Sequence, residues 1–410
     1  MESFLKSFSI EAKYYLMMNG LFSFGSALSS VFLSIFLWRL DQTFTLLAHY
    51  SLYVSLSILL SFYFCAWLAR KTSPMTTMRL GILFYLAAYL IALILKDSLV
   101  KQIFFLGISQ GIAISLFSVG VHMSTLDMAT NQNRDRFLYI QGFVTAIGGV
   151  VGPLLAGFLI EQFNGMFGYY IVFSITCLFF ILAIIVSLPI QGRPIEAKSH
   201  LLDVLLHAPR EWKWMYVVML GDGVVSGVYV TFLISMMVYD VAGGELNLGI
   251  FQMVSEMVSI VSLLVLAKLS TPEKRVLVYT IGTIGIFLCS LFLAYHPTFI
   301  GLILFVLVKP VALNMINTTM NTMIYASIEK DPLYEKMRLD YITIREVPLG
   351  VGRMIGVFIF LGMKNYFDLD RLLPVSFSLF PVIYLMMVPV LYMIWHKKDS
   401  RKKYIGKLYN

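Results

Sequence analysis

The stretch LARKTSP at residues 68–74 is almost repeated by LAKLSTP at residues 266–272. Each copy follows a long apolar run and ends that run close to basic residues. A second pair, RFLYI at residues 136–140 and RLDYI at residues 338–342, recurs at nearly the same spacing, about half the chain length. Two matches at one spacing predict that the chain consists of two similar halves in tandem.

The composition indicates that the apolar runs lie in a membrane. Hydrophobic residues make up 59% of the chain and charged residues 13%, whereas soluble domains carry about 45–50% and about 25%. A bilayer is crossed by roughly 20 helical residues, and several stretches of that length or more contain no Asp, Glu, Lys or Arg: residues 14–38, 42–69, 102–126, 137–160, 162–192 and 372–396. Further spans are predicted near residues 80–95, 214–239, 246–267, 276–295, 298–325 and 341–363. The chain is therefore predicted to be an all-α membrane protein with twelve transmembrane helices.

The basic residues orient these helices. Lys and Arg gather in the termini and in alternate loops, and basic residues in short loops stay on the cytoplasmic side. Both termini are therefore predicted to be cytoplasmic, in a protein of the cell (plasma) membrane. The net charge of +8 fits a basic inner surface beside anionic membrane lipids, so no nucleic-acid partner is expected.

The repeated stretches also predict the domain organisation. Both pairs fall in inner loops or just inside them, so the halves face the same way across the membrane, as in transporters built from two parallel six-helix repeats. We expect pseudo-symmetric six-helix bundles at residues 1–190 and 214–410. Residues 191–213 would form a cytoplasmic linker with an amphipathic segment.

A resemblance to a known family rests on GGVVGPLLAG at residues 148–157, which is similar to the Gly-Pro motif of antiporters in the major facilitator superfamily (MFS). The resemblance covers the whole chain and extends to a branch from Gram-positive bacteria. It implies the MFS fold, transport by alternating access and a bias toward export. Gly152 and Pro153 are predicted hinge residues, since proline removes a helix hydrogen bond; close helix packing at the glycines is the alternative.

Other motifs of the family are altered in this chain. The loop after the second span normally contains Gly-x-Leu-Ala-Asp-Arg, and this chain has AWLARK at residues 66–71, with Arg70 in place of the acid. The fourth span has GISQG at residues 107–111 and lacks the arginine that many relatives use for proton coupling. These two family roles cannot be carried over to this chain.

Charged residues inside the spans are the strongest functional candidates, because each costs at least about 2.5–3.5 kcal/mol to insert. They are Asp222, Glu256, Lys309 and Arg353. The resemblance places the spans of Asp222 and Lys309 at the cavity, which predicts substrate contact. Glu256, with Asp222, is predicted to couple transport to protons, since a buried carboxyl group near a base can titrate near neutral pH. Structural ion pairs across neighbouring helices are the alternative for all four.

Polar residues extend the predicted site. Asn314 and Asn317 follow Lys309 at helical spacing, and Asn19 and Gln110 lie in spans of the first half; all four are predicted to bind substrate.

The stretch REVPLGVGR at residues 345–353 holds a predicted gate. It places Glu346 and Arg353 two turns apart on one helix face. Pro348 lies between them and is expected to kink the helix. We predict a gating hinge at these three residues, near the inner face of the membrane, with an anchoring ion pair to the inner loop as the alternative.

These features together predict a monomeric secondary transporter that moves a small molecule by alternating access, coupled to protons and favouring export. A lipid or glycolipid flippase on the same scaffold, with an amphiphilic substrate, is the alternative. The sequence has no HExxH, GxSxG or Walker motif, so an enzyme is not expected. It has no filter or charge ring of a channel. Its three cysteines lack ligand spacing, so no cofactor or metal is expected.

Overall fold

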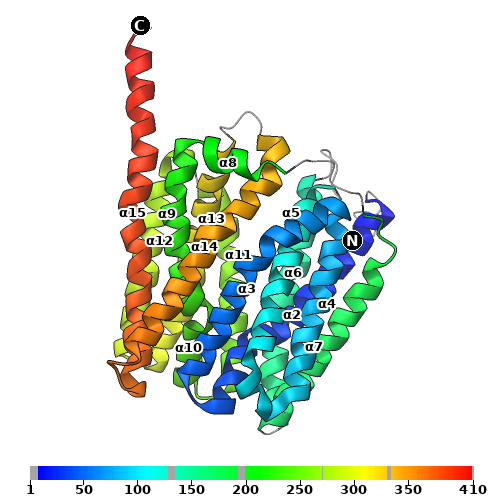
Figure 1. Ribbon diagram of the computed structural model, residues 1–410. Helices are drawn as coiled ribbons and strands as arrows, with labels where there is room; N and C mark the ends of the chain where they lie inside the picture. Colours follow the sequence, from blue (N-terminus) through cyan, green and yellow to red (C-terminus); the bar gives the residue numbers. More distant parts are fainter. Residues whose placement is uncertain are drawn as a thin grey trace. The chain divides into compact units, whose positions relative to one another are not determined.

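The computed structural model describes residues 8–127, 134–163, 165–192, 199–269, 271–329 and 334–408. These residues form helices and turns and no strand (Figure 1). The prediction of an all-α protein is confirmed.

The helices divide into two compact units by their contacts, Met1–Ser199 with Ile234–Met257 and His200–Leu233 with Val258–Asn410. Unit 1 contains α2 (Ile10–Asp41), α3 (Phe44–Lys71), α4 (Pro74–Leu95), the 3-10 helix η1 (Lys96–Gln102), α5 (Ile103–Asp127), α6 (Arg134–Gln162), α7 (Met166–Ser187), α10 (Ile234–Ala242) and the first half of α11 (Glu245–Leu269). Unit 2 contains α8 (Leu201–His207), α9 (Arg210–Val225), the π-helix η2 (Ser226–Leu233), the rest of α11, the 3-10 helix η3 (Pro272–Lys274), α12 (Arg275–Tyr295), α13 (Phe299–Ile328), α14 (Tyr334–Met363) and α15 (Leu369–Leu408).

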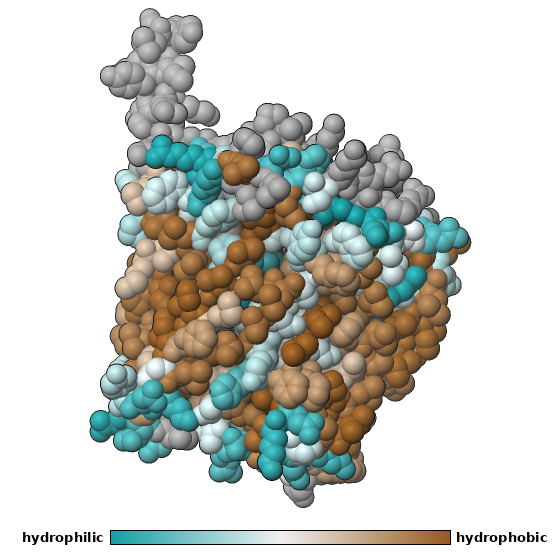
Figure 2. All heavy atoms as spheres, viewed as in Figure 1, coloured by the Kyte–Doolittle hydropathy of each residue, from teal (hydrophilic) through white to brown (hydrophobic). Residues whose placement is uncertain are grey.

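Eleven helical segments in the described part of the chain are long and apolar enough to cross a membrane. The longest, Pro74–Ser124, is an antiparallel hairpin of α4 and α5, in which the Ser109 hydroxyl donates to the Phe84 carbonyl oxygen at 2.9 Å. Counting its two helices separately would give twelve spans, but the number of crossings and the side of the termini stay predictions. On the face drawn in Figure 2, hydrophobic residues cover the middle of the helices and hydrophilic residues gather near their ends.

The two copies of the repeated stretch lie at corresponding turns. In the first copy α3 ends at Lys71, the Ser73 hydroxyl accepts a hydrogen bond from the Thr76 amide at 3.1 Å, and Pro74 begins α4. A proline suits this position because its missing N–H would have no partner in the first turn. In the second copy α11 ends at Leu269 and η3 precedes α12. Both copies therefore connect two long helices.

The helices pair in the same order in the two units. In unit 1, α2 packs on α6 and α7, and α4 packs on α5 and α7. In unit 2, α9 packs on α14 and α15, and α12 packs on α13 and α15. This correspondence is what a tandem duplication produces. The predicted boundaries at residues 190 and 214 stay predictions, and the packing adds α10 and the start of α11 to unit 1.

Glycines bring two helices of unit 2 into backbone contact. A Cβ atom at Gly223 or Gly227, on α9 and η2, would lie 2.3 or 2.6 Å from a carbonyl oxygen of α14. A Cβ atom at Gly352 or Gly356, on α14, would lie 2.2 or 2.3 Å from a carbonyl oxygen of α9. Each pair has the GxxxG spacing by which membrane helices approach closely. The same contact positions the charged residues beside these glycines.

The close contact between α9 and α14 predicts that the stability of the protein depends steeply on side-chain size at the contacting glycines. Gly352→Ala should lower the free energy of unfolding by about 1–3 kcal/mol, since the added methyl group forces the helices apart. Gly362→Ala is the matched control on the same helix, because a Cβ there meets nothing within 4 Å; alanine should even favour the helix slightly. Thermal unfolding of the purified protein in detergent measures both, and equal midpoints for the two variants would contradict the close contact.

Candidate functional site

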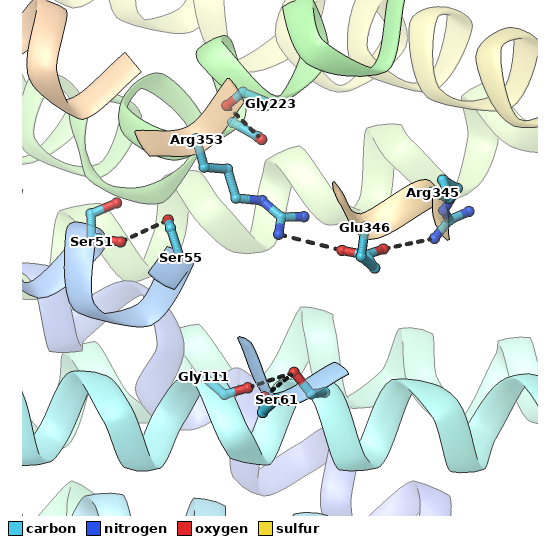
Figure 3. Close-up of polar contacts among 10 residues, drawn as sticks. Ser51, Ser55, Ser61, Gly111, Gly223, Arg345, Glu346 and Arg353 are labelled. Atoms are coloured by element: carbon cyan, nitrogen blue, oxygen red, sulfur yellow. Dashed lines mark hydrogen bonds and ion pairs between the residues drawn. The ribbon is translucent and has the colours of Figure 1, made fainter. Parts of the chain in front are cut away.

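An acid and two bases form a cluster on α14. Figure 3 shows Glu346 between Arg345 and Arg353, with each guanidinium 3.4 Å from a carboxylate oxygen. The side chain of Glu346 is buried. Glu346 and Arg353, which were predicted to share one face of the helix, are in contact across two turns. Pro348 lies inside α14, which continues as helix to Met363, and the hinge role of the three residues stays a prediction.

Asp222 of α9 joins this cluster. The Tyr384 hydroxyl of α15 donates to its Oδ1 at 3.1 Å, and the positive charges of Arg353 and Arg345 act on its carboxylate. The backbone contact at Gly223, the next residue, explains why Asp222 lies so close to α14. Two acids and two arginines offset each other's charge, which lowers the cost of holding them in a span. Tyr384 carries no signal in the sequence, since tyrosine is abundant throughout the chain.

Two polar atoms in or near the predicted site remain unsatisfied. The Arg345 Nε donor and the Gln110 Oε1 acceptor are buried and have no hydrogen-bond partner among the described residues. Gln110 belongs to α5 in unit 1. A buried polar atom without a partner costs about 1–3 kcal/mol, so each atom would gain from a bound polar molecule.

Lys309 lies in another part of unit 2. It is buried on α13 directly before Pro310, and its charge acts on the Cys289 thiol of α12. Asp222 and Arg353 belong to the α14 cluster, Lys309 faces α12, and Glu256 belongs to unit 1.

The two asparagines of α13 differ in what they contact. Asn314 Nδ2 donates to the Ser259 carbonyl oxygen at 3.1 Å, to Ser259 Oγ at 3.0 Å and to Ser262 Oγ at 2.6 Å, all on α11. Its amide donor is therefore engaged in packing α13 on α11. Asn317, one turn further, is exposed and remains accessible to a substrate.

Asn19 also uses its side-chain amide for a hydrogen bond within the protein. It is buried on α2, and its Nδ2 donates to the Tyr15 carbonyl oxygen of the same helix at 3.0 Å. Its predicted contact with substrate would have to use the amide oxygen or the second N–H of the amide.

The Gly-Pro stretch of α6 packs on two helices of unit 1. Gly148 and Gly152 face α2, where an added Cβ atom would lie 3.1 or 2.9 Å from the nearest atom. Gly149, Pro153 and Gly157 face the first half of α11, and a Cβ at Gly157 would lie 2.6 Å from its backbone. Close packing, the alternative reading of this stretch, is therefore present; bending at Gly152 and Pro153 stays a prediction.

Glu256 rests against the same stretch. Its Oε2 lies 3.5 Å from the position of a Cβ at Gly149, and its Oε1 accepts a hydrogen bond from Gln252 Nε2 at 3.2 Å. The carboxylate predicted to couple protons is thus placed at the contact between α6 and α11. The free-energy cost of a charge at that position depends on how closely α6 and α11 approach each other.

A cavity that the sequence did not indicate lies between α12 and α13. Its volume is about 660 Å³. Its lining is almost entirely apolar and includes Gly285, Leu288, Phe292, His296, Leu304 and Val308. A cavity of this chemistry fits a hydrocarbon chain better than a polar solute.

Comparison with known proteins identifies relatives along most of the chain. The sequence pattern of the Major Facilitator Superfamily matches residues 16–333. YqgE of Bacillus subtilis (strain 168), described as an uncharacterized protein, is 26% identical over 377 residues, which are 90% of this chain and 87% of that protein. An uncharacterized protein in the sodM 3'region of Geobacillus stearothermophilus is 30% identical over 159 residues, 38% of this chain and 74% of that protein.

Solved structures show the same fold. A mutant of the nucleoside transporter NupG is 13% identical, with a TM-score of 0.71 over 94% of this chain and 100% of that one. A bacterial homologue of the iron transporter ferroportin, in its inward-facing state, is 13% identical with a TM-score of 0.64, over 93% of this chain and 99% of that one. At such identities the likeness concerns the fold alone, and it confirms the expected MFS fold.

The contacts of α13 separate a packing asparagine from an accessible one. Asn314→Ala should lower the free energy of unfolding by about 0.6–1.7 kcal/mol, the range for hydrogen bonds between membrane helices. Asn317→Ala, its neighbour one turn away, should leave unfolding unchanged because its side chain is exposed. Thermal unfolding in detergent compares them; an Asn314→Ala midpoint equal to that of the parent would show that its bonds to Ser259 and Ser262 do not hold α13 to α11.

Proposed function

Because the chain belongs to the Major Facilitator Superfamily, a family of membrane transporters rather than enzymes, we propose that it is a proton-coupled exporter of a small polar molecule in the cell membrane. Transport by alternating access follows from the family. The observation that carries the finer proposal is the cluster of Asp222, Arg345, Glu346 and Arg353 within apolar helices. Charged groups at such positions are costly and are typically retained for substrates or ions.

Substrate contact is proposed at Asp222 and Lys309. The first offers a carboxylate held by the Tyr384 hydroxyl, and the second offers a buried cation. Arg345 Nε and Asn317 supply further hydrogen-bonding atoms of unit 2 that are not used in packing. Groups of both signs with unused donors and acceptors suit a polar solute.

Proton coupling is proposed at Glu256, with Asp222 as the second acid. Protonation removes the charge of a carboxylate and turns one oxygen into a donor. At Glu256 this change occurs 3.5 Å from the Cβ position of Gly149 on α6. Proton binding would thus alter the cost of holding α11 against the Gly-Pro stretch, which links a proton to helix packing.

Export is proposed from the resemblance of residues 148–157 to the Gly-Pro motif of antiporters. The glycine contacts of α6 with α2 and α11 support a role for this stretch in the arrangement of the helices. Gly152 and Pro153 are the residues at which we propose bending.

A lipid or glycolipid flippase is the second candidate function, favoured by the apolar cavity between α12 and α13. Val308 lines the cavity, and the buried Lys309 is the next residue of α13. An apolar cavity on a helix that also carries a buried cation would suit an amphiphile with an anionic headgroup. Movement of a headgroup-labelled lipid by reconstituted protein, without movement of a soluble solute, would favour this function.

A ligand screen tests the proposed site. A transported solute should raise the unfolding temperature of the parent, because a ligand that binds only the folded state stabilises it. The shift should be lost in Asp222→Asn and in Lys309→Met. Asp370→Asn, the same change at an exposed acid of α15, should retain the full shift. A ligand that stabilises the parent and both site variants equally would place substrate binding elsewhere.

The role of Glu256 is tested with that solute in proteoliposomes. Glu256→Gln should abolish uphill movement driven by a pH gradient, since the amide binds no proton, and should preserve exchange of solute without a gradient. The matched control is Glu161→Gln, at an exposed acid of α6, which should behave as the parent. Unchanged gradient-driven transport in Glu256→Gln would refute the assignment.

A further inference from the structure

Three side chains of unit 1 converge on one carboxylate oxygen. Glu245 Oε1 lies 2.5 Å from Arg39 Nη2 and accepts hydrogen bonds from the Tyr169 hydroxyl at 2.8 Å and the Tyr239 hydroxyl at 3.4 Å. Arg39 Nη2 also donates to the Tyr239 hydroxyl at 3.0 Å, and its guanidinium lies 6.0 Å from the centre of the Tyr169 ring. We name these four residues the Glu245 cluster.

The anion of the cluster is buried, whereas its cation is partly exposed to solvent. Glu245 is 7% exposed and Tyr169 is fully buried, whereas the side chain of Arg39 is 37% exposed. Removing the partner of a buried charge is strongly unfavourable, so Glu245 holds Arg39 firmly while the helices stay together. Arg39 already has access to water and can be hydrated when they separate. Such a pair stabilises one arrangement without forbidding another.

The four residues come from helices that are distant in the sequence. Arg39 lies in the last turn of α2 and Tyr169 in the first turn of α7. Tyr239 lies in the last turn of α10, and Glu245 is the first residue of α11. In the predicted topology all four lie at the outer ends of their spans. The cluster therefore fastens helices of the first half of the chain to helices of the second half.

The connection between α10 and α11, next to Glu245, consists of two glycines. Gly243 and Gly244 separate α10 from α11 with φ angles of 77° and 159°. Residues with a side chain rarely adopt a positive φ angle, whereas glycine does so without strain. A Cβ atom at either glycine would meet nothing within 4 Å, so no neighbouring group presses on these two positions. Backbone freedom at the two glycines would allow the start of α11 to turn relative to α10 once the cluster opens.

We propose that the Glu245 cluster is a latch that closes the outer ends of α2, α7, α10 and α11, and that it must break before the outer side opens. The proposal deepens the proposed function, because it assigns the residues that regulate access to the same transport path. Arg39 and Glu245 supply most of the strength through charge. Tyr169 and Tyr239 fix the position of the carboxylate.

The latch is tested without any substrate, by distances between spin labels. Cys65, Cys177 and Cys289 are replaced by serine, and Phe167→Cys on α7 and Asp240→Cys on α10, both exposed, carry the labels. Double electron–electron resonance of the protein in nanodiscs should give mainly a short distance. Glu245→Gln should raise the longer-distance population at least about tenfold, since a hydrogen bond to a charged group contributes that much or more. Tyr169→Phe should give a smaller rise.

A control variant and a charge swap complete the test. Glu161→Gln, an exposed acid at the end of α6, should keep the parent distribution. Arg39→Glu and Glu245→Arg should each lose the short distance, and the double variant should regain it; this test remains valid even if Glu245→Gln folds poorly. A parent-like distribution in folded Glu245→Gln, or a double variant that stays open, would overturn the latch. Neither result depends on ligand binding, so a failed ligand screen would count against the proposed function alone.

Discussion

A charge inside hydrocarbon has to be neutralised by the protein itself, and this constraint organises the polar part of the molecule. The carboxylate of Glu346 lies between two guanidinium groups, and that of Asp222 receives the Tyr384 hydroxyl within reach of the same arginines. At the end of α2, Arg39 and two tyrosine hydroxyls satisfy Glu245. In each case other side chains supply the partners of the carboxylate. The charges therefore fix which helices lie together, and a change in helix arrangement has to change them as well.

Glycine makes these charge contacts geometrically available. Gly223 follows Asp222 and Gly352 precedes Arg353, and both bring α9 and α14 into backbone contact. On the other unit, Gly157 of α6 lies against the backbone of Glu245, and Gly149 lies against the carboxylate of Glu256. A larger residue at Gly223, Gly352 or Gly157 would clash with the facing backbone and displace the neighbouring charge, whereas Gly149 has room for a methyl group. The glycines that look like simple spacers in the sequence thus control electrostatics as much as packing.

The sequence predicted what depends on local pattern and missed what depends on helix neighbours. Charge-free runs predicted the helices, and a spacing of seven residues predicted that Glu346 and Arg353 share one helix face, where the structure pairs them. The structure adds that Asn314 uses its amide on Ser259 and Ser262, which no spacing along α13 could reveal because the acceptors belong to α11. The contact between Arg39 and Glu245 was not predicted, for a related reason. Charged residues are ordinary at the ends of spans, and only the fold brings these two together.

The two carboxylates of α11 connect the proposals to each other. Glu245 and Glu256 lie eleven residues apart on one helix, about 16 Å along its axis, and both positions contact the Gly-Pro stretch of α6. A contact lined by glycines has few interlocking side chains to oppose a shift of one helix along the other. Protonation of Glu256 lowers the cost of burying that side chain, whereas the latch at Glu245 favours one position of the same helix end. A rigid helix that carries both groups would therefore transmit a proton-dependent change at mid-span to the contact that closes the outer side, and α11 on α6 would be the two-state element that such coupling requires.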